Sequence, residues 1–298
     1  MLPLRSETVD DVPPEFRFVA SAARVGAKFF ELGPVDIEIE TWSEIDHSES
    51  KVGLGGSAAI VAATLGAIAA ASGGRPADAK LLAGLGVAAH RLAQKGGSGA
   101  DVVATTLGGL QWISGLDAAR VPQTVGEAAL GVPFDAERLE LPAGLTLDVV
   151  FTGQSVRTGP RIDRFVALAG AEQQSGREAS GPVSAWCDAM EDATRSLRDA
   201  CVGDSALEAM AAMQQGREVF GALGPLIGFE MWSAGLTAAC RDRAGWATKP
   251  SGAGGGDCAV SLLSQSDLTS RRESWRMEGL QPLESRASVE GVRVDAQS

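Results

Sequence analysis

The chain has 298 residues, which is enough for one large domain or two domains of ordinary size. Hydrophobic residues make up 45% of it and charged residues 21%, a balance that provides a folded core and excludes global disorder. Its 26 lysines and arginines against 38 aspartates and glutamates give a net charge of −12, so a nucleic acid or an anionic membrane surface is a poor partner.

Helical and extended patterns alternate along the chain. Apolar residues recur every three or four positions in the helical segments, and the run 58–72 is apolar on all sides, which predicts a buried helix. Residues 35–41 alternate between apolar and polar side chains, as expected of a half-exposed strand. We expect helices over residues 16–32, 58–72, 77–94, 161–173, 183–201, 205–223, 229–242 and 270–278, and strands over 35–41, 145–152 and 258–263. These elements predict an α+β protein of two units, residues 1–142 and residues 143–298.

The cysteines and histidines exclude two kinds of site. The four cysteines are scattered and form no C-x-x-C pair, which disfavours a disulfide framework and a zinc site. The two histidines, His47 and His90, are too few for a histidine cage around a metal. The first seven residues lack the apolar core of a secretory signal, and residues 58–71 are too short to cross a bilayer. We therefore expect a cytoplasmic protein with reduced thiols.

Three glycine-rich junctions precede apolar elements. The first, residues 51–59, stands before the helix at 58–72, where free N–H groups can face a phosphate and Ser57 can cap the helix or reach a magnesium ion. It lacks the Gly-Lys-Ser/Thr of a Walker loop, and a tight turn with a serine cap remains the alternative for this junction taken alone.

The other two junctions add a carboxylate and a longer glycine run. At the second junction, residues 96–101, Asp101 is a candidate catalytic carboxylate or a helix cap. The third, residues 251–257, carries four glycines and no bulky side chain directly before an apolar strand. Three such junctions in one chain favour a phosphate-binding protein without defining its reaction.

Together these segments resemble the GHMP kinase superfamily, and within it the phosphomevalonate kinase branch. Gly53-Leu-Gly-Gly-Ser-Ala58 resembles the family's ATP-phosphate loop. Gly97-Ser-Gly-Ala-Asp101, approached by His90 and Gln94, resembles its acidic motif. Lys249-Pro-Ser-Gly-Ala-Gly-Gly-Gly-Asp-Cys258 resembles a motif of the phosphomevalonate kinase branch and is nearly identical to it.

The resemblance implies a fold and an activity. The fold is the GHMP kinase fold, with a ribosomal-protein-S5-like, ATP-binding domain that lacks its first strands in residues 1–142 and a ferredoxin-like domain in residues 143–298. The activity is transfer of the ATP γ-phosphoryl group to the phosphate of 5-phosphomevalonate, with Mg²⁺, in the mevalonate route to isoprenoids. The expected partner is this small molecule, and the chain could form a homodimer.

The same resemblance implies roles for individual residues. Asp101 would be the catalytic residue, and Ser57 would help to hold Mg²⁺. The backbone N–H groups of residues 251–256 would face the charge that moves in the transition state. ATP would be bound by Gly53, Leu54, Gly55, Gly56, Ser57 and Ala58, and the substrate phosphate by Ser98, Gly99, Lys249, Ser251, Gly252, Ala253, Gly254 and Gly255.

The chain departs from the family at three places. Gly56 stands where the family has the first serine of a pair, which keeps the backbone site. The basic residue before Gly-Ser-Gly is shifted to Lys95. The family's opening Pro-Gly-Lys segment, with its catalytic lysine, has no counterpart before Phe16.

The missing opening leads to an expectation and keeps two alternatives open. We expect that Met1 is a mis-assigned start, and that the chain as written is poorly soluble or marginally stable, and inactive. The alternatives are another GHMP kinase, such as a mevalonate kinase, and a non-catalytic protein that keeps the fold for binding. The Lys249–Cys258 motif opposes the first alternative, and the retained Ser57 and Asp101 oppose the second.

Overall fold

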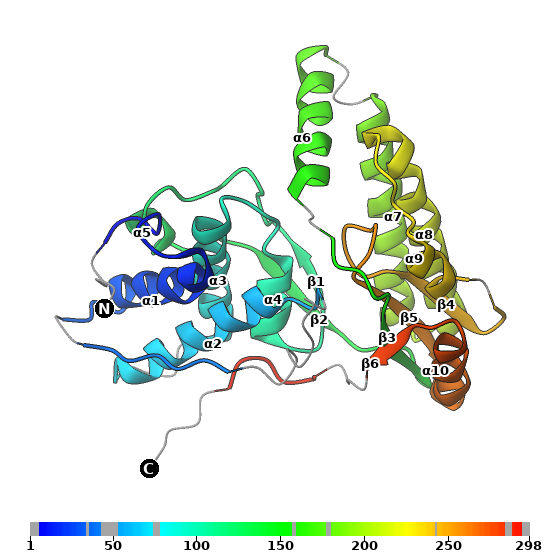
Figure 1. Ribbon diagram of the computed structural model, residues 1–298, viewed down its shortest axis with the longest axis horizontal. Helices are drawn as coiled ribbons and strands as arrows, with labels where there is room; N and C mark the ends of the chain where they lie inside the picture. Colours follow the sequence, from blue (N-terminus) through cyan, green and yellow to red (C-terminus); the bar gives the residue numbers. More distant parts are fainter. Residues whose placement is uncertain are drawn as a thin grey trace. The chain divides into compact units, whose positions relative to one another are not determined.

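A computed structural model describes residues 6–33, 36–42, 53–73, 78–156, 159–176, 180–241, 243–283 and 288–293 (Figure 1). The chain divides into two compact units. Unit 1 contains Met1–Ser43, Gly55–Leu139 and Ser288–Ser298, and unit 2 contains Glu44–Leu54 and Glu140–Ala287. Each unit therefore includes a short segment that lies far along the chain from the rest of it.

Unit 1 is built mainly from helices. Their bounds are η1 Pro14–Phe16, α1 Arg17–Phe29, α2 Gly56–Ala71, α3 Ala79–Gln94, α4 Ala100–Leu107 and α5 Val125–Ala128. Two strands, β1 (Leu110–Ser114) and β2 (Asp135–Leu139), pair antiparallel with Leu110 opposite Leu139. The helices expected over 16–32, 58–72 and 77–94 are confirmed as α1, α2 and α3.

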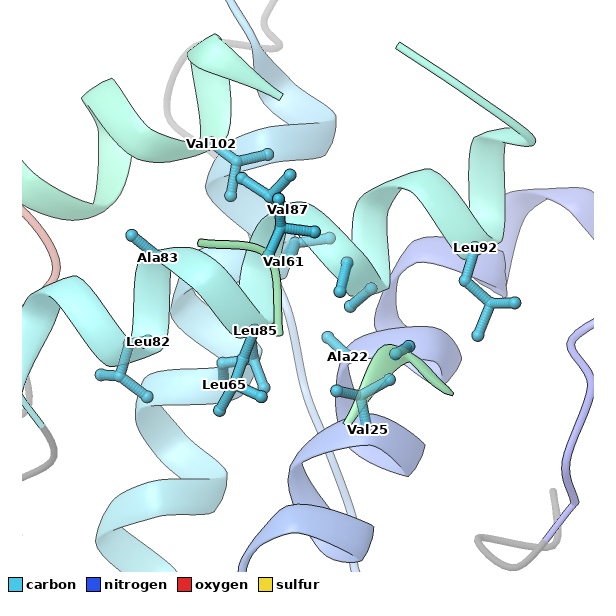
Figure 2. Packing of buried hydrophobic residues seen from close by; sticks show 14 of the residues in the cluster. Ala22, Val25, Val61, Leu65, Leu82, Ala83, Leu85, Val87, Leu92 and Val102 are labelled. Carbon is cyan, nitrogen blue, oxygen red and sulfur yellow. The ribbon is translucent and has the colours of Figure 1, made fainter. Parts of the chain in front are cut away.

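Small side chains let these helices approach closely. Figure 2 shows Val61, Val87 and Val102, from α2, α3 and α4, converging in the core. At Gly86 of α3, an added Cβ would lie 2.8 Å from Val102 Cγ1, and at Gly84 it would lie 2.9 Å from the carbonyl oxygen of Val132. Glycine at these positions is therefore a packing requirement, because a methyl group would collide with a neighbouring segment.

Unit 2 contains a four-stranded antiparallel sheet in the order β4-β5-β3-β6. The strands are β3 Leu145–Phe151, β4 Trp246–Pro250, β5 Cys258–Ser264 and β6 Gln281–Leu283, and the helices are α6 Gly159–Gln174, α7 Pro182–Val202, α8 Ala206–Ile227, α9 Ala234–Ala239, η2 Gln265–Asp267 and α10 Leu268–Met277. The strands expected at 145–152 and 258–263, and the helices expected at 161–173, 183–201, 205–223 and 270–278, are confirmed.

Side chains on the two faces of β5 belong to different cores. Leu262 packs with Ala209 and Met213 of α8, whereas Ala259 packs with Leu236 of α9 and Trp275 of α10. Successive side chains of a strand point to opposite faces, so helices cover both faces of this sheet.

Three expectations need correction. Residues 36–42 form no strand, and Val35 lies outside the described residues; an alternating pattern makes a strand only where another strand pairs with it. Helix α2 is not buried on all sides, because its alanines 59, 63, 67 and 70 are exposed. Within 229–242 the helix is confined to Ala234–Ala239. In the described parts of the chain, no helix combines the length and apolar character that crossing a membrane requires.

Candidate active site

The first glycine junction forms the beginning of α2. Gly55 is the N-cap residue in the left-handed conformation, with φ of 78°, and no side chain caps the helix. Ser57 is therefore the second residue of the helix and not its cap. Because the first N–H groups of a helix have no partner within it, the N–H groups of Gly56, Ser57 and Ala58 are placed to receive an anion.

Ser57 is joined to α3 by a hydrogen bond. The distance from Ser57 Oγ to His90 Nε2 is 3.0 Å. The His90 ring is 3% exposed and lies 4.9 Å, between ring centroids, from Phe18. Burial lowers the pKa of His90, while the Asp101 carboxylate acts in the opposite direction. His90 is therefore hydrogen-bonded to Ser57 of the first glycine junction, and its pKa responds to the charge of Asp101 in the second.

Arg91 of α3 forms hydrogen bonds with the backbone of the second glycine junction. This side chain is fully buried, and it donates from Nε to the carbonyl oxygen of Gly97 at 3.0 Å and from Nη2 to that of Ser98 at 2.7 Å. Its Nη1 donates to the carbonyl oxygens of Asp117 and Arg120. A guanidinium group presents its donors in a fixed fork, so Arg91 determines the path of the backbone just before α4.

Asp101 lies in the first turn of α4 and is exposed. The N-cap of α4 is Gly99, with φ of 77° and no side-chain cap, so Asp101 does not cap the helix. Its Oδ1 accepts a hydrogen bond from the N–H of Val102 at 2.9 Å. Lys95, by contrast, is engaged elsewhere, since its Nζ forms an ion pair with Asp10 at 2.9 Å.

The third glycine junction lies in unit 2 and is partly committed to internal hydrogen bonds. The N–H groups of Ser251 and Gly255 donate to the carbonyl oxygens of Cys258 and Met231, at 2.9 and 2.8 Å. Within the described part of the chain, the N–H groups of Gly252, Ala253 and Gly254 make no hydrogen bond. These three N–H groups, unlike those of Ser251 and Gly255, are not engaged within the chain and can receive a ligand.

Packing explains two glycines of this junction. A Cβ at Gly254 would lie 2.6 Å from Phe220 Cζ, and one at Gly256 would lie 2.6 Å from Val156 Cγ2. At Gly255 it would meet the guanidinium group of Arg161. Gly252, by contrast, faces open space. Gly254 and Gly256 are therefore required by their neighbours, whereas the Arg161 side chain next to Gly255 could move aside.

Two cations lie at this junction. Lys249, at the end of β4, is half-buried and donates from Nζ to the carbonyl oxygen of Pro250 at 2.9 Å, and burial lowers its pKa. Arg161 of α6 packs against Gly255, over the ring of Phe229, and donates to the carbonyl oxygen of Glu230 at 3.2 Å. The motif pointed to Lys249, whereas Arg161 lies more than 90 positions away in the sequence and carried no signal.

Gly53, from the first glycine junction, belongs to unit 2 and lies against Asp257. Its φ is +76°, and a Cβ there would lie 2.8 Å from Asp257 Cγ. Two motifs separated by 200 residues are therefore in direct contact at these two residues, which the sequence pattern alone did not indicate.

Comparisons with known proteins define the family. The model of the GHMP kinases N terminal domain matches residues 17–109. The chain is 30% identical over 267 residues to the phosphomevalonate kinase of Streptomyces sp. (strain CL190), covering 84% of this chain and 68% of that protein. This protein therefore belongs to the GHMP kinase family, and within it to the phosphomevalonate kinases.

Solved structures show the same fold. A Lin0012 protein from Listeria innocua superposes with a TM-score of 0.74 at 20% identity, over 95% of this chain and 81% of that one. The Streptococcus pneumoniae phosphomevalonate kinase, in complex with phosphomevalonate and AMPPNP, gives a TM-score of 0.73 at 15% identity, over 96% of this chain and 83% of that one. The expected GHMP kinase fold is thus confirmed.

Proposed function

We propose that this protein transfers the γ-phosphoryl group of ATP to the phosphate of 5-phosphomevalonate, forming 5-diphosphomevalonate and ADP in the mevalonate route to isoprenoids. The bond from the γ-phosphorus to its bridging oxygen breaks as an acceptor phosphate oxygen bonds to that phosphorus. The observation that carries the proposal is the open beginning of α2, where the N-cap residue is Gly55 and Ser57 Oγ lies 3.0 Å from His90 Nε2.

The beginning of α2 suits the nucleotide phosphates. Its first N–H groups and the positive end of the helix dipole attract an anion, and Gly55 and Gly56 let the phosphates approach the backbone. The chain has a net charge of −12, so such local groups are needed to hold a polyphosphate. We assign ATP binding to residues 53–58 on this basis.

The hydroxyl oxygen of Ser57 suits Mg²⁺. Among the described residues, no three His, Cys, Asp or Glu side chains form a metal cluster. Mg²⁺ in nucleotide sites takes one or two protein oxygens, with phosphates and water supplying the rest, so Ser57 would be one donor in such a set. When bound, the ion supplies charge neutralisation of the phosphates.

Asp101 and the third junction would act on the reacting phosphates. The acceptor oxygen is already ionised at neutral pH, so we assign Asp101 to positioning the reactants and not to removing a proton. The N–H groups of Gly252, Ala253 and Gly254 are assigned to the substrate phosphate, together with Ser98, Gly99, Lys249, Ser251 and Gly255. Of these, Ser251 and Gly255 would act through the shape of the loop, because their N–H groups are engaged.

The test is a coupled assay of ADP release with two acceptors, 5-phosphomevalonate and mevalonate. Turnover with 5-phosphomevalonate and none with mevalonate is expected. Equal turnover of mevalonate would indicate a mevalonate kinase, and no turnover of either acceptor would indicate a non-catalytic protein.

A further inference from the structure

We propose that His90 is a positioning residue whose Nε2–H donates a hydrogen bond to Ser57 Oγ and thereby orients this hydroxyl for the nucleotide phosphates. The inference rests on the proposed function, since that function gives Ser57 its role. The two residues lie on different helices, α2 and α3, 33 positions apart in the sequence, and their polar atoms are 3.0 Å apart.

The environment holds the His90 ring in one place. The side chain is 3% exposed, and Phe18 of α1 lies against the ring, with 4.9 Å between centroids. The residues before and after it in α3, Ala89 and Arg91, are fully buried. The ring therefore cannot turn to solvent, and Ser57 is its hydrogen-bond partner among the described residues.

The unpartnered ring nitrogen assigns the tautomer. His90 Nδ1 is buried and has no hydrogen-bond partner in the described structure. A proton on Nδ1 would leave a buried donor without a hydrogen-bond partner, which is unfavourable. A proton on Nε2 instead satisfies that donor at Ser57 and leaves only a lone pair without a partner, which folded proteins tolerate more often.

This tautomer determines what Ser57 can offer a ligand. When Ser57 Oγ accepts from His90, the hydroxyl proton is not consumed by the imidazole and can be donated to a phosphate oxygen. The remaining lone pair stays available to a cation. Without His90, the hydroxyl would turn among its staggered rotamers, and ordering it would oppose nucleotide binding.

The first experiment reads the hydrogen bond itself. The chain has two histidines, so nitrogen NMR of the ¹⁵N-histidine-labelled protein gives four ring signals, a pair from each histidine, and His90→Gln identifies the pair from His90. We expect a neutral ring protonated at Nε2, with resonances that shift in Ser57→Ala. Ser72→Ala, at the far end of α2, is the matched control and should leave them in place. Protonation at Nδ1, or no shift in Ser57→Ala, would overturn the proposal.

The second experiment measures binding of AMPPNP with Mg²⁺ by calorimetry, which does not depend on turnover. His90→Met should weaken binding about tenfold, as loss of an outer partner of a ligating group does, whereas His90→Gln keeps an N–H donor and should stay within about threefold. In a Ser57→Ala protein, His90→Met should weaken AMPPNP binding by less than a further twofold or so, because the hydroxyl that it positions is already absent. An equal loss in both backgrounds would show that His90 acts through the fold and not through Ser57.

The two proposals fail separately. In one outcome the nucleotide binds and the effects of His90→Met and Ser57→Ala on its affinity are not additive, but 5-phosphomevalonate is not phosphorylated. The positioning role then stands and the proposed function is wrong. If 5-phosphomevalonate is phosphorylated while His90→Met and Ser57→Ala are additive, the function stands and the positioning role is wrong. Thermal unfolding of each variant verifies that it is folded under the assay conditions.

Discussion

Both units contain buried arginines, and two of them, Arg91 of unit 1 and Arg271 of unit 2, have different kinds of partner. Arg91 of unit 1 donates to backbone carbonyl oxygens of two loops, around residues 97–98 and residues 117–120. Arg271 of unit 2 lies between the rings of Trp246 and Trp275, 4.6 and 4.4 Å from their centroids. It donates to the hydroxyl of Thr248 and the carbonyl oxygen of Ala239, in the core.

The difference lies in what each guanidinium group organises. Loops lack the regular backbone hydrogen bonds of helices and sheets, so their carbonyl oxygens need other donors. Arg91 supplies such donors and thereby defines the path of the backbone before Asp101. The partners of Arg271 belong to strands, helices and packed aromatic rings that other contacts already hold. Burial lowers the pKa of Arg91, and it lowers that of Arg271 to about 10, so Arg271 stays charged at neutral pH. Arg91 organises the backbone of the candidate site, whereas Arg271 stabilises the core of unit 2.

The largest effect is expected at the carboxylate that the Arg91 loop presents. Asp101→Asn should lower kcat about 10²-fold or more, because the charge acts on the reacting phosphates. Asp101 is exposed, so the unfolding midpoint should change little. Steady-state kinetics with ATP and 5-phosphomevalonate provide the measurement, with Asp135→Asn, an exposed carboxylate on β2, as the control. Activity close to wild type in Asp101→Asn would remove this residue from the site.

Arg91→Lys should reduce both stability and activity. A lysine keeps the charge but cannot reach several carbonyl oxygens in the fork geometry, and buried acceptors without partners cost about 2–4 kcal/mol in total. The residual folded protein should also lose about tenfold in kcat/KM, because the path of residues 97–101 loosens. Urea unfolding and kinetics below the transition test both effects. A loss of stability with unchanged kcat/KM would show that Arg91, like Arg271, serves stability alone.

Arg271→Met should reduce stability without a comparable kinetic effect. Loss of the cation between two tryptophan rings and of two buried hydrogen bonds should cost about 2 kcal/mol, while the methionine fills most of the space. Under conditions where the protein is folded, kcat/KM should stay within about twofold of wild type. A kinetic loss as large as that of Arg91→Lys would show that unit 2 also uses its buried arginine for catalysis.

A smaller effect comes from the packing of glycines. Gly84→Ala in α3 should destabilise the protein by about 1–3 kcal/mol, because the new methyl group would meet the carbonyl oxygen of Val132. Gly170→Ala in α6 is the matched control, since nothing lies within 4 Å of its added Cβ. It should stabilise the protein by about 0.5–1 kcal/mol through helix propensity. Equal effects at the two positions would contradict the close helix packing assigned to unit 1.

The smallest perturbation uses the thiols as reporters. All four cysteines belong to unit 2, where Cys187 is exposed and Cys201, Cys240 and Cys258 are buried. A thiol reagent should modify Cys187 first, and the other three should react as unit 2 opens in urea. Arg271→Met should hasten this slow phase more than Gly84→Ala does. Four thiols reacting at one rate in the native protein would contradict the burial.

The same thiols predict a pH dependence. Burial raises the pKa of Cys258 to about 12, above the ordinary value of 9.0 that it would have in the unfolded chain. Between these values the folded protein holds the proton more tightly, so the free energy of unfolding is unaffected below pH 9 and falls as pH rises above it. Urea unfolding from pH 8 to 10.5 measures this fall, and Cys258→Ala should reduce it. An unchanged slope in Cys258→Ala would assign the fall to other groups.

The sequence by itself determined the elements whose pattern is local. Helices α1, α3, α7 and α8 follow from apolar residues at helical spacing, α2 from a continuous apolar run, and β3 and β5 from apolar runs bounded by turn residues. The three glycine junctions, with Ser57 and Asp101, and the family resemblance were also readable, because each motif is continuous in the chain.

The tertiary structure decided whatever depends on a distant partner. Strands β1, β2, β4 and β6 were not predicted, and the strand expected at 35–41 is wrong, because a short extended segment becomes a strand only when another segment pairs with it. The bond between Ser57 and His90, the fork of Arg91 and the contact of Arg161 with Gly255 each join residues from separate elements. Such contacts arise when elements pack and buried polar groups find their partners, and no local sequence pattern encodes which distant residue arrives.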